Sequence, residues 1–208
     1  SFGLCLFVTS TVFSEFFKGA SAIRAKNGMN FIAATVELTH RNTRRYGGYL
    51  VHMGVVAMFI GFTGAAFNLD TTVEAAKGDS FKLGRYELKV RDIVDTENED
   101  YVSRKASIDV SVNGSQIDTL YPERRFYKAS QQGTSEVAIR RRLNEDLYLN
   151  FAGANDPKKA VVQAYVFPLV TWIWVGFWIL FAGTIVCLIP SKIRMQYART
   201  EVVGIARN

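Results

Sequence analysis

Apolar residues gather in long uncharged runs near both ends of the chain. Three runs are long enough for a membrane helix: Ser1–Phe17, in which Glu15 is the one charged residue, Gly47–Phe67 and Tyr165–Ile189. About 20 helical residues, at a rise of ~1.5 Å each, match the ~30 Å hydrocarbon core of a bilayer. The pattern therefore predicts three transmembrane helices.

Between the second and third runs, apolar and polar positions alternate with a period of two. The alternation is clearest in Tyr86–Val94, Ser107–Val112 and Glu136–Ile139, and Asn113-Gly114 follows the second of these. Alternation of this kind is typical of antiparallel strands, and Asn-Gly is typical of a type I′ hairpin turn. We expect residues 68–164 to form an antiparallel β domain of six or seven strands, inserted into an α-helical integral membrane protein.

The charge distribution predicts an orientation in the membrane. The net charge of the 208 residues is +6. Lys18–Tyr46 carries six basic residues and one acidic residue, and the tail Pro190–Asn208 carries four basic residues and one acidic residue. Residues 68–164 carry 15 basic and 16 acidic residues and are nearly neutral. If the three spans alternate, both basic segments lie on one side, which the positive-inside rule assigns to the cytoplasm. The β domain is then periplasmic, the location is a bacterial inner membrane, and nucleic-acid binding is not expected.

Two finer patterns concern helix packing. Residues 18–46 mix apolar and polar side chains at helical spacing, which predicts an amphipathic helix at the inner membrane surface. Gly47, Gly54 and Gly61 recur every seven residues, so they form a stripe on which a neighbouring helix can pack closely. His52 lies about 140° around the helix from Gly47 and should face a different neighbour.

His52 is the main candidate for chemistry, because a titratable side chain within an apolar span needs a partner. It could be a polar residue that bonds a neighbouring helix, a proton relay, or a ligand to a metal or haem iron. Tyr49 shares its helix face and could offer a hydroxyl next to the imidazole.

Other candidates have simpler interpretations beside the functional ones. Arg140–Arg142 could meet a haem propionate or an acidic partner, or could be a solvated strand edge. His40 is expected in a solvated or interfacial position, Glu15 at the inner interface, and Trp172 and Trp174 in an aromatic belt.

The positions of the two cysteines and of Ser1 lead to two further expectations. Cys5 and Cys187 lie in different spans and are not expected to form a disulfide. The first apolar run begins at Ser1 without a charged flank, so we expect the C-terminal piece of a larger membrane protein.

Several short elements resemble the C-terminal part of the CcmF family, the cytochrome c haem lyase component of bacterial cytochrome c maturation. They occur in the family's order and cover nearly the whole chain: Glu15–Gly19 (EFFKG), Arg45–Gly54 (RYGGYLVHMG), Thr134–Ile139 (TSEVAI), Asp146–Tyr148 (DLY) and Pro168–Gly176 (PLVTWIWVG). A paralogue dedicated to nitrite reductase assembly shares these elements.

The resemblance implies a membrane enzyme that attaches haem to Cys-x-x-Cys-His motifs of apocytochrome c. It implies a b-type haem held by two histidines on different helices, of which His52 matches the second and the first would lie upstream of Ser1. The implied partners are the haem chaperone, the apocytochrome-handling subunits and apocytochrome c. The family's tryptophan-rich haem-handling motif and periplasmic histidines are absent, so we expect this segment alone to be inactive. The alternative function is a non-catalytic membrane anchor or assembly scaffold whose periplasmic β domain docks partners.

Overall fold

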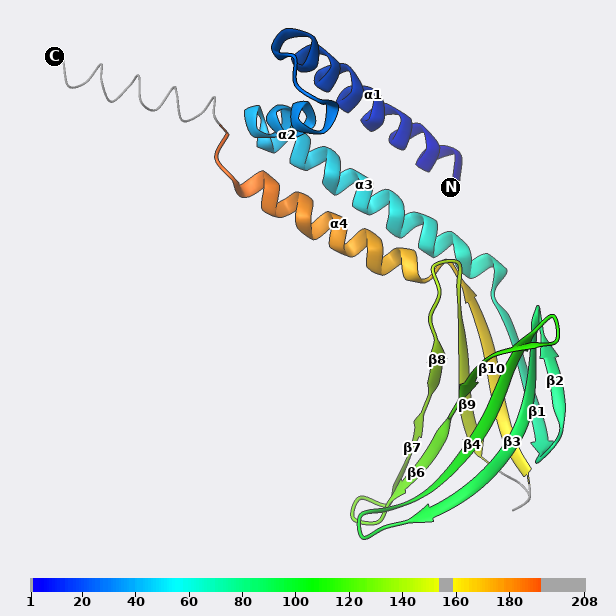
Figure 1. Cartoon of the computed structure of the whole chain (residues 1–208). Helices are drawn as coiled ribbons and strands as arrows, with labels where there is room; N and C mark the ends of the chain where they lie inside the picture. Colours follow the sequence, from blue (N-terminus) through cyan, green and yellow to red (C-terminus); the bar gives the residue numbers. More distant parts are fainter. Residues whose placement is uncertain (1, 154–158, 192–208) are drawn as a thin grey trace. The chain divides into compact units, whose positions relative to one another are not determined.

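The computed structural model describes residues 2–153 and 159–191, which form two compact units (Figure 1). One unit is helical and comprises Ser1–Thr63 with Trp172–Asn208; the other is a β unit, Gly64–Thr171. Most of the predicted basic tail lies outside the described residues.

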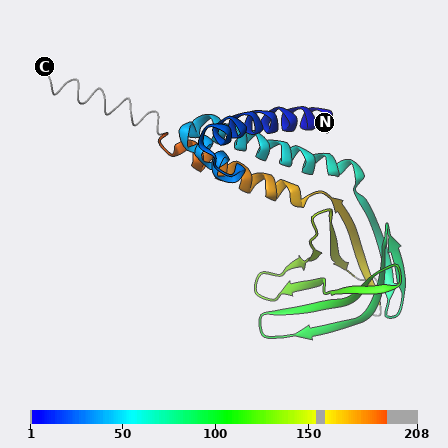
Figure 2. The same ribbon diagram turned by 45° about the horizontal axis from the view of Figure 1, so that its top comes forward.

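The helical unit contains α1 (Phe2–Asn27), α2 (Phe31–Arg41), α3 (Thr43–Thr63) and α4 (Thr171–Leu188). Figures 1 and 2 show α3 running between α1 and α4. Gly28, with φ 66°, ends α1, and the Asn30 side chain accepts a hydrogen bond from Ala33 N at the start of α2. The predicted amphipathic segment is therefore divided: its first third continues α1, and its centre forms α2, which buries Ala34 and Leu38.

The glycine stripe of α3 packs on a matching stripe of α4. A Cβ atom built at Gly54 would lie 2.6 Å from Leu180 N, and one built at Gly47 would lie 2.6 Å from Cys187 Sγ. From the other side, Cβ atoms at Gly176 and Gly183 would lie 2.5 Å from Gly54 O and 2.7 Å from Val51 N. The predicted close helix contact is confirmed, because these glycines let the two backbones approach without side chains between them.

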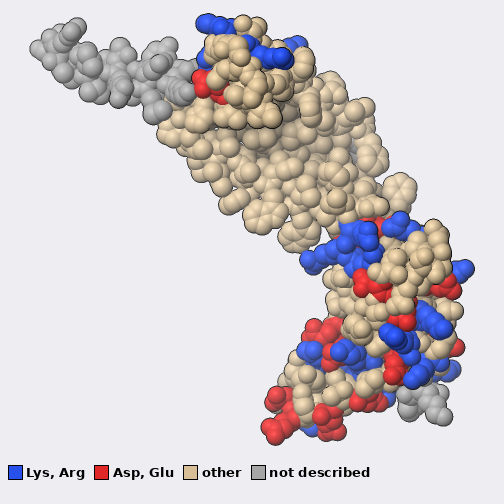
Figure 3. All heavy atoms as spheres, viewed as in Figure 1, with Lys and Arg blue, Asp and Glu red and all other residues tan. Residues whose placement is uncertain are grey.

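Within the described residues, two helical segments are long and apolar enough to cross a membrane: Thr43–Phe67, which adds the 3₁₀ turn η1 (Gly64–Phe67) to α3, and α4. In the most apolar 18-residue stretch of each segment, only 28% of the residues of Thr43–Phe67 and 11% of those of α4 are buried. A core helix of a soluble protein would be mostly buried. Figure 3 shows few charged side chains on the visible face of the helical unit, except where α1 meets α2. Two of the three predicted spans are thus supported. The third, Ser1–Phe17, corresponds from Phe2 onward to the first part of α1, and Ser1 lies outside the described residues. α1 carries Glu15 and Lys18 and is not among the helices apolar enough to cross a membrane.

The β unit is a sandwich of two antiparallel sheets, and its described residues form ten strands, more than the six or seven expected. One sheet has the order β1-β10-β9-β8 and the other β2-β3-β4-β6-β7, with β5 also pairing with β4. The strands are β1 (Leu69–Ala76), β2 (Ser80–Leu83), β3 (Tyr86–Glu97), β4 (Tyr101–Val112), β5 (Ser115–Leu120), β6 (Glu123–Tyr127), β7 (Gln132–Glu136), β8 (Ala138–Arg140), β9 (Glu145–Gly153) and β10 (Lys159–Pro168).

The sandwich core comes from alternate residues of both sheets. Leu88, Ile108 and Val110 of one sheet share a buried cluster with Leu149 and Val162 of the other. The predicted Asn113-Gly114 turn joins β4 to β5 through the pairs Val112↔Ser115 and Ser111↔Gln116. The period-two prediction is therefore correct for the fold class, although it missed several short strands.

The boundary between the β domain and the last helix differs from the prediction. Tyr165–Pro168, expected to open the third span, is the end of β10. Val166 faces the core, while Tyr165 and Phe167 stack at 5.8 Å on the opposite face of the sheet. A strand with apolar residues on both faces has a continuous apolar sequence. The prediction therefore joined this strand to the helix that follows it. Pro168 ends the strand, and α4 begins at Thr171.

Candidate functional site

His52 lies on the face of α3 that is turned toward α1. Its side chain is exposed and borders a cavity of 180 Å³ whose other lining residues are apolar: Leu4, Cys5, Val8, Val55, Val56 and Phe59. Among the described residues, none forms a hydrogen bond or ion pair with the imidazole. The glycine stripe faces α4 instead, which confirms that His52 and the stripe have different neighbours. An imidazole in this setting is available to a group that this segment does not supply.

Tyr49, one turn earlier on α3, takes part in a polar cluster rather than contacting His52. Its hydroxyl accepts a hydrogen bond from Arg45 Nε at 3.1 Å and lies 3.4 Å from Glu15 Oε2. The Arg45 guanidinium also pairs with Glu15 and lies 5.9 Å from the centroid of the Tyr46 ring. Phe16 completes the cluster against Tyr46, with ring centroids 5.1 Å apart.

This cluster was not foreseen from the sequence, which left Glu15 without a named partner. Glu15 and Phe16 come from α1, whereas Arg45, Tyr46 and Tyr49 come from the first two turns of α3. The signal was present in the resemblance: EFFKG and RYGGY are two of its elements, and the antiparallel packing of α1 on α3 brings them together. A carboxylate close to an apolar segment is less costly when a guanidinium and a hydroxyl compensate it.

The remaining candidates are separate from His52. His40 is exposed on α2 and borders a small cavity with Val36, Val186 and Ile189. Of the two tryptophans expected in an aromatic belt, Trp174 is 65% exposed and Trp172 is half-buried. Trp178, one turn further along α4, is 62% exposed. Cys5 and Cys187 are both free, and the structure places Cys5 next to the His52 cavity.

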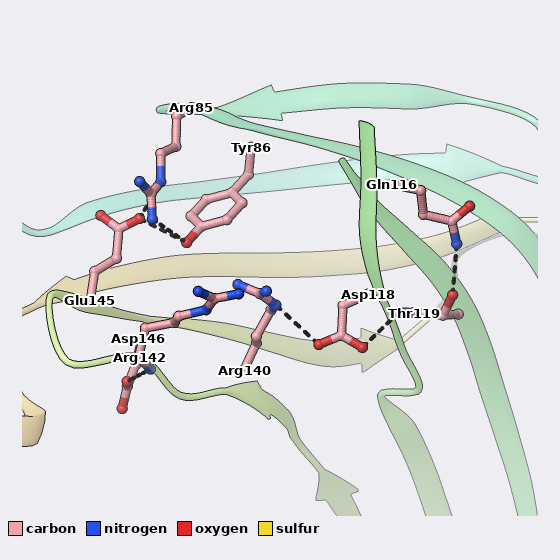
Figure 4. Close-up of polar contacts among 9 residues, drawn as sticks. All are labelled: Arg85, Tyr86, Gln116, Asp118, Thr119, Arg140, Arg142, Glu145 and Asp146. Carbon is pink, nitrogen blue, oxygen red and sulfur yellow. Dashed lines mark hydrogen bonds and ion pairs between the residues drawn. The ribbon is translucent and has the colours of Figure 1, made fainter. Parts of the chain in front are cut away.

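Arg140–Arg142 lie in the β unit and divide into one buried and two exposed residues. Arg140 is 9% exposed, and its Nε donates to Asp118 Oδ2 at 3.0 Å (Figure 4). Arg141 and Arg142 are exposed. Nearby, Tyr86 donates to Glu145 at 2.7 Å, and Glu145 pairs with Arg85 at 2.7 Å. Burial is the main cause that raises the pKa of Tyr86, so this hydroxyl stays protonated and joins the two sheets.

The residues around His52 fit a haem only as half a site. An exposed imidazole on an apolar helix could hold a haem iron, and the surrounding apolar side chains would suit the macrocycle. The other histidine, His40, borders a different cavity, and the described residues contain no group of three or more His, Cys, Asp or Glu side chains arranged for a metal ion. A second axial ligand would have to come from elsewhere.

The comparisons with known proteins agree with this architecture. Residues 66–168 match the family described as CcmF C-terminal beta-sandwich. The chain is 28% identical over 174 residues to the cytochrome c-type biogenesis protein CcmF of Haemophilus influenzae, which covers 83% of this chain and 26% of that protein. It is also 28% identical over 133 residues to the cytochrome c-type biogenesis protein NrfE of the same bacterium, over 64% of this chain and 21% of that protein.

A solved structure described as Cytochrome c Heme Lyase CcmF shares the fold. It superposes with a TM-score of 0.60 at 16% sequence identity and covers 88% of this chain and 34% of that chain. The chain spans about a quarter of the length of the curated relatives it matches. The β unit coincides almost residue for residue with the matched region, and the similarity extends into the helices on both sides. The chain therefore belongs to the CcmF family and contains the C-terminal beta-sandwich of that family.

Proposed function

We propose that this chain is part of a membrane haem lyase that joins haem to Cys-x-x-Cys-His motifs of apocytochrome c, and that His52 is an axial ligand of a b-type haem in the membrane. The observation that carries the ligand assignment is the exposed imidazole on an apolar face of α3, which has no hydrogen-bond or ion-pair partner among the described residues. An unpaired imidazole in lipid would cost several kcal/mol, so a partner outside this segment must satisfy it.

The surrounding residues would hold and orient this ligand. Val55, Val56 and Phe59 continue the apolar face of α3, and Leu4 and Val8 of α1 flank it, so water would be excluded once a further helix covers the site. The Glu15–Arg45–Tyr49 cluster fixes α1 against the first turns of α3, just before His52. When bound, haem supplies one-electron chemistry, and its potential depends on the axial ligands and on burial.

The proposed topology has three spans and a periplasmic β unit. Residues 2–14 of α1 are uncharged and lie along α3, so they share its membrane layer, while Glu15 and Arg45 mark the cytoplasmic edge. The basic residues of α1 and α2 then lie in the cytoplasm, in agreement with the positive-inside rule. The partners we propose are a haem chaperone, apocytochrome-handling subunits and apocytochrome c. NrfE has the same 28% identity to this chain as CcmF, although over 133 residues rather than 174, so both maturation systems are candidates.

Replacement of His52 in the intact full-length protein tests the ligand. His52→Ala should lose membrane-bound b-type haem, or convert it from six- to five-coordinate, because one axial position becomes vacant. Added imidazole should partly restore the low-spin absorbance spectrum. His40→Ala is the matched control and should leave the spectrum unchanged. If purified His52→Ala protein keeps its full haem content and low-spin spectrum, His52 is not a ligand, and the scaffold function gains support.

A further inference from the structure

A loop of the β unit, residues 141–144, is attached to the residues that lead into α4. Asn144 O accepts a hydrogen bond from Leu169 N at 2.8 Å, and Arg142 O accepts one from Thr171 Oγ1 at 3.0 Å. On the other side of the loop, Arg142 N donates to Asp146 Oδ1 at 3.0 Å. These bonds hold the loop next to Thr171, the first residue of α4.

The length of α4 determines where Thr171 can lie in a bilayer. Its 18 residues span about 27 Å, slightly less than the ~30 Å hydrocarbon core. If α4 crosses the membrane, as the proposed function requires, Thr171 lies at the boundary of that core. Groups hydrogen-bonded to Thr171 then lie in the headgroup layer, which is about 5–7 Å thick on each side.

The side chains of the loop suit this layer. Leu143, at the loop tip, is 65% exposed, and Phe67, next to β1, is 62% exposed. Arg141 and Arg142 are exposed, and neither forms an ion pair within the described part of the chain. In Figure 4 the Arg142 side chain points toward that of Arg140, whose guanidinium pairs with Asp118. Basic side chains gather over this end of the β unit in Figure 3.

We propose that the loop 141–144 is a lipid-binding site, in which Leu143 enters the membrane interface and Arg141 and Arg142 bind the phosphate of an anionic phospholipid. Arg141 and Arg142 are adjacent, exposed and without an ion-pair partner among the described residues, so both guanidinium groups are available to an added anion. Arginine binds phosphate through bidentate hydrogen bonds. The exposed leucine is stabilised by the same lipid, because its side chain leaves water.

Lipid binding can be measured on the full chain by native mass spectrometry, with phosphatidylglycerol or phosphatidylcholine titrated into detergent micelles. The wild-type chain should retain phosphatidylglycerol in preference to phosphatidylcholine. Arg141→Gln with Arg142→Gln should weaken that binding about thirtyfold, since each arginine near an anionic leaflet contributes about a factor of five. The matched control is Lys82→Gln with Lys89→Gln, which removes the same charge from exposed positions of β2 and β3 and should leave the affinity unchanged.

The depth of the loop provides a second measurement in nanodiscs that contain both lipids. A nitroxide at Leu143→Cys, in a chain whose Cys5 and Cys187 are replaced by alanine, should be accessible to oxygen and shielded from a water-soluble nickel complex. The same label at Phe126→Cys, another exposed apolar position of the β unit, should be accessible to the nickel complex.

Two results would overturn the lipid site. One is equal retention of both lipids by the wild-type chain, or binding of inorganic phosphate that abolishes the preference, which would indicate a site for free anions. The other is a water-exposed label at position 143. The haem spectrum of His52→Ala is independent of both measurements, so failure of this site and failure of the ligand assignment can be told apart.

Discussion

Asn113 and Gly114 adopt φ values of 51° and 77°, and both positive values are what a type I′ turn requires. Gly114→Val would place a β-branched residue in this region, at a cost of about 1–3 kcal/mol in the free energy of unfolding. Thermal unfolding of the intact chain in detergent, followed by the circular dichroism of the strands, should show a lower midpoint. Gly133→Val is the control, because its Cβ would meet only ordinary contacts at 3.7 Å or more and Gly133 has no positive φ.

The Glu123–Arg125 pair should make the β unit sensitive to acid. Arg125 donates to both carboxylate oxygens of Glu123, at 3.0 Å and 3.2 Å, and this is the main cause that holds the pKa of Glu123 below its ordinary value of 4.5. A folded pKa below the unfolded one means that the pair stabilises the fold above pH 4.5 and that this stabilisation is lost as the pH falls through the lower, folded pKa.

Glu123→Gln should therefore lower the free energy of unfolding by about 1–2 kcal/mol at neutral pH. The difference from the wild-type protein should shrink as the pH falls below 4.5. Denaturant unfolding at a series of pH values measures this. Glu99→Gln removes the same charge from an exposed position and is the control; a difference that stays constant with pH would contradict the assigned cause.

At the scale of the helices, the contact between α3 and α4 depends on its glycines. Gly54→Ala places a methyl group 2.6 Å from Leu180 N and 2.7 Å from Gly176 O, so the helices must separate, and we expect a loss of about 1–3 kcal/mol in stability. Gly48→Ala is the same substitution six residues earlier, on another face of α3, where a Cβ meets nothing within 4 Å. Alanine has the higher helix propensity, so this control should gain up to about 1 kcal/mol. Thermal unfolding of both variants in one detergent compares them, and equal shifts would refute the packing role.

At the scale of the whole chain, the topology can be tested by cysteine labelling in spheroplasts. In a chain without Cys5 and Cys187, Glu99→Cys in the β3–β4 turn should react with a membrane-impermeant maleimide in intact spheroplasts. Lys26→Cys, at the end of α1, should react only after the membrane is permeabilised. Both positions are exposed in the structure, so access is not limited by folding. The reverse labelling pattern would place the β unit in the cytoplasm.

The sequence by itself determined the properties that depend on local patterns. An apolar run that is long enough to span a membrane predicts a helix whatever its neighbours are, so α3 and α4 could be recognised from length and composition. Period-two alternation predicts strands, and Asn113-Gly114 predicts a hairpin because few residues accept positive φ. The glycine spacing identified the packing face of α3, and the short elements of the chain identified its family. These features are encoded within a few neighbouring residues.

Only the tertiary structure decided what depends on residues that are distant in the chain. The pairing of Glu15 with Arg45, the division of ten strands between two sheets and the position of Cys5 next to His52 all arise from packing between elements, and no local pattern specifies them. The end of β10 was misassigned because a strand with apolar residues on both faces has the composition of a membrane helix. The attachment of loop 141–144 to Thr171 joins segments more than 20 residues apart, so it became visible only once the two sheets had brought these segments together.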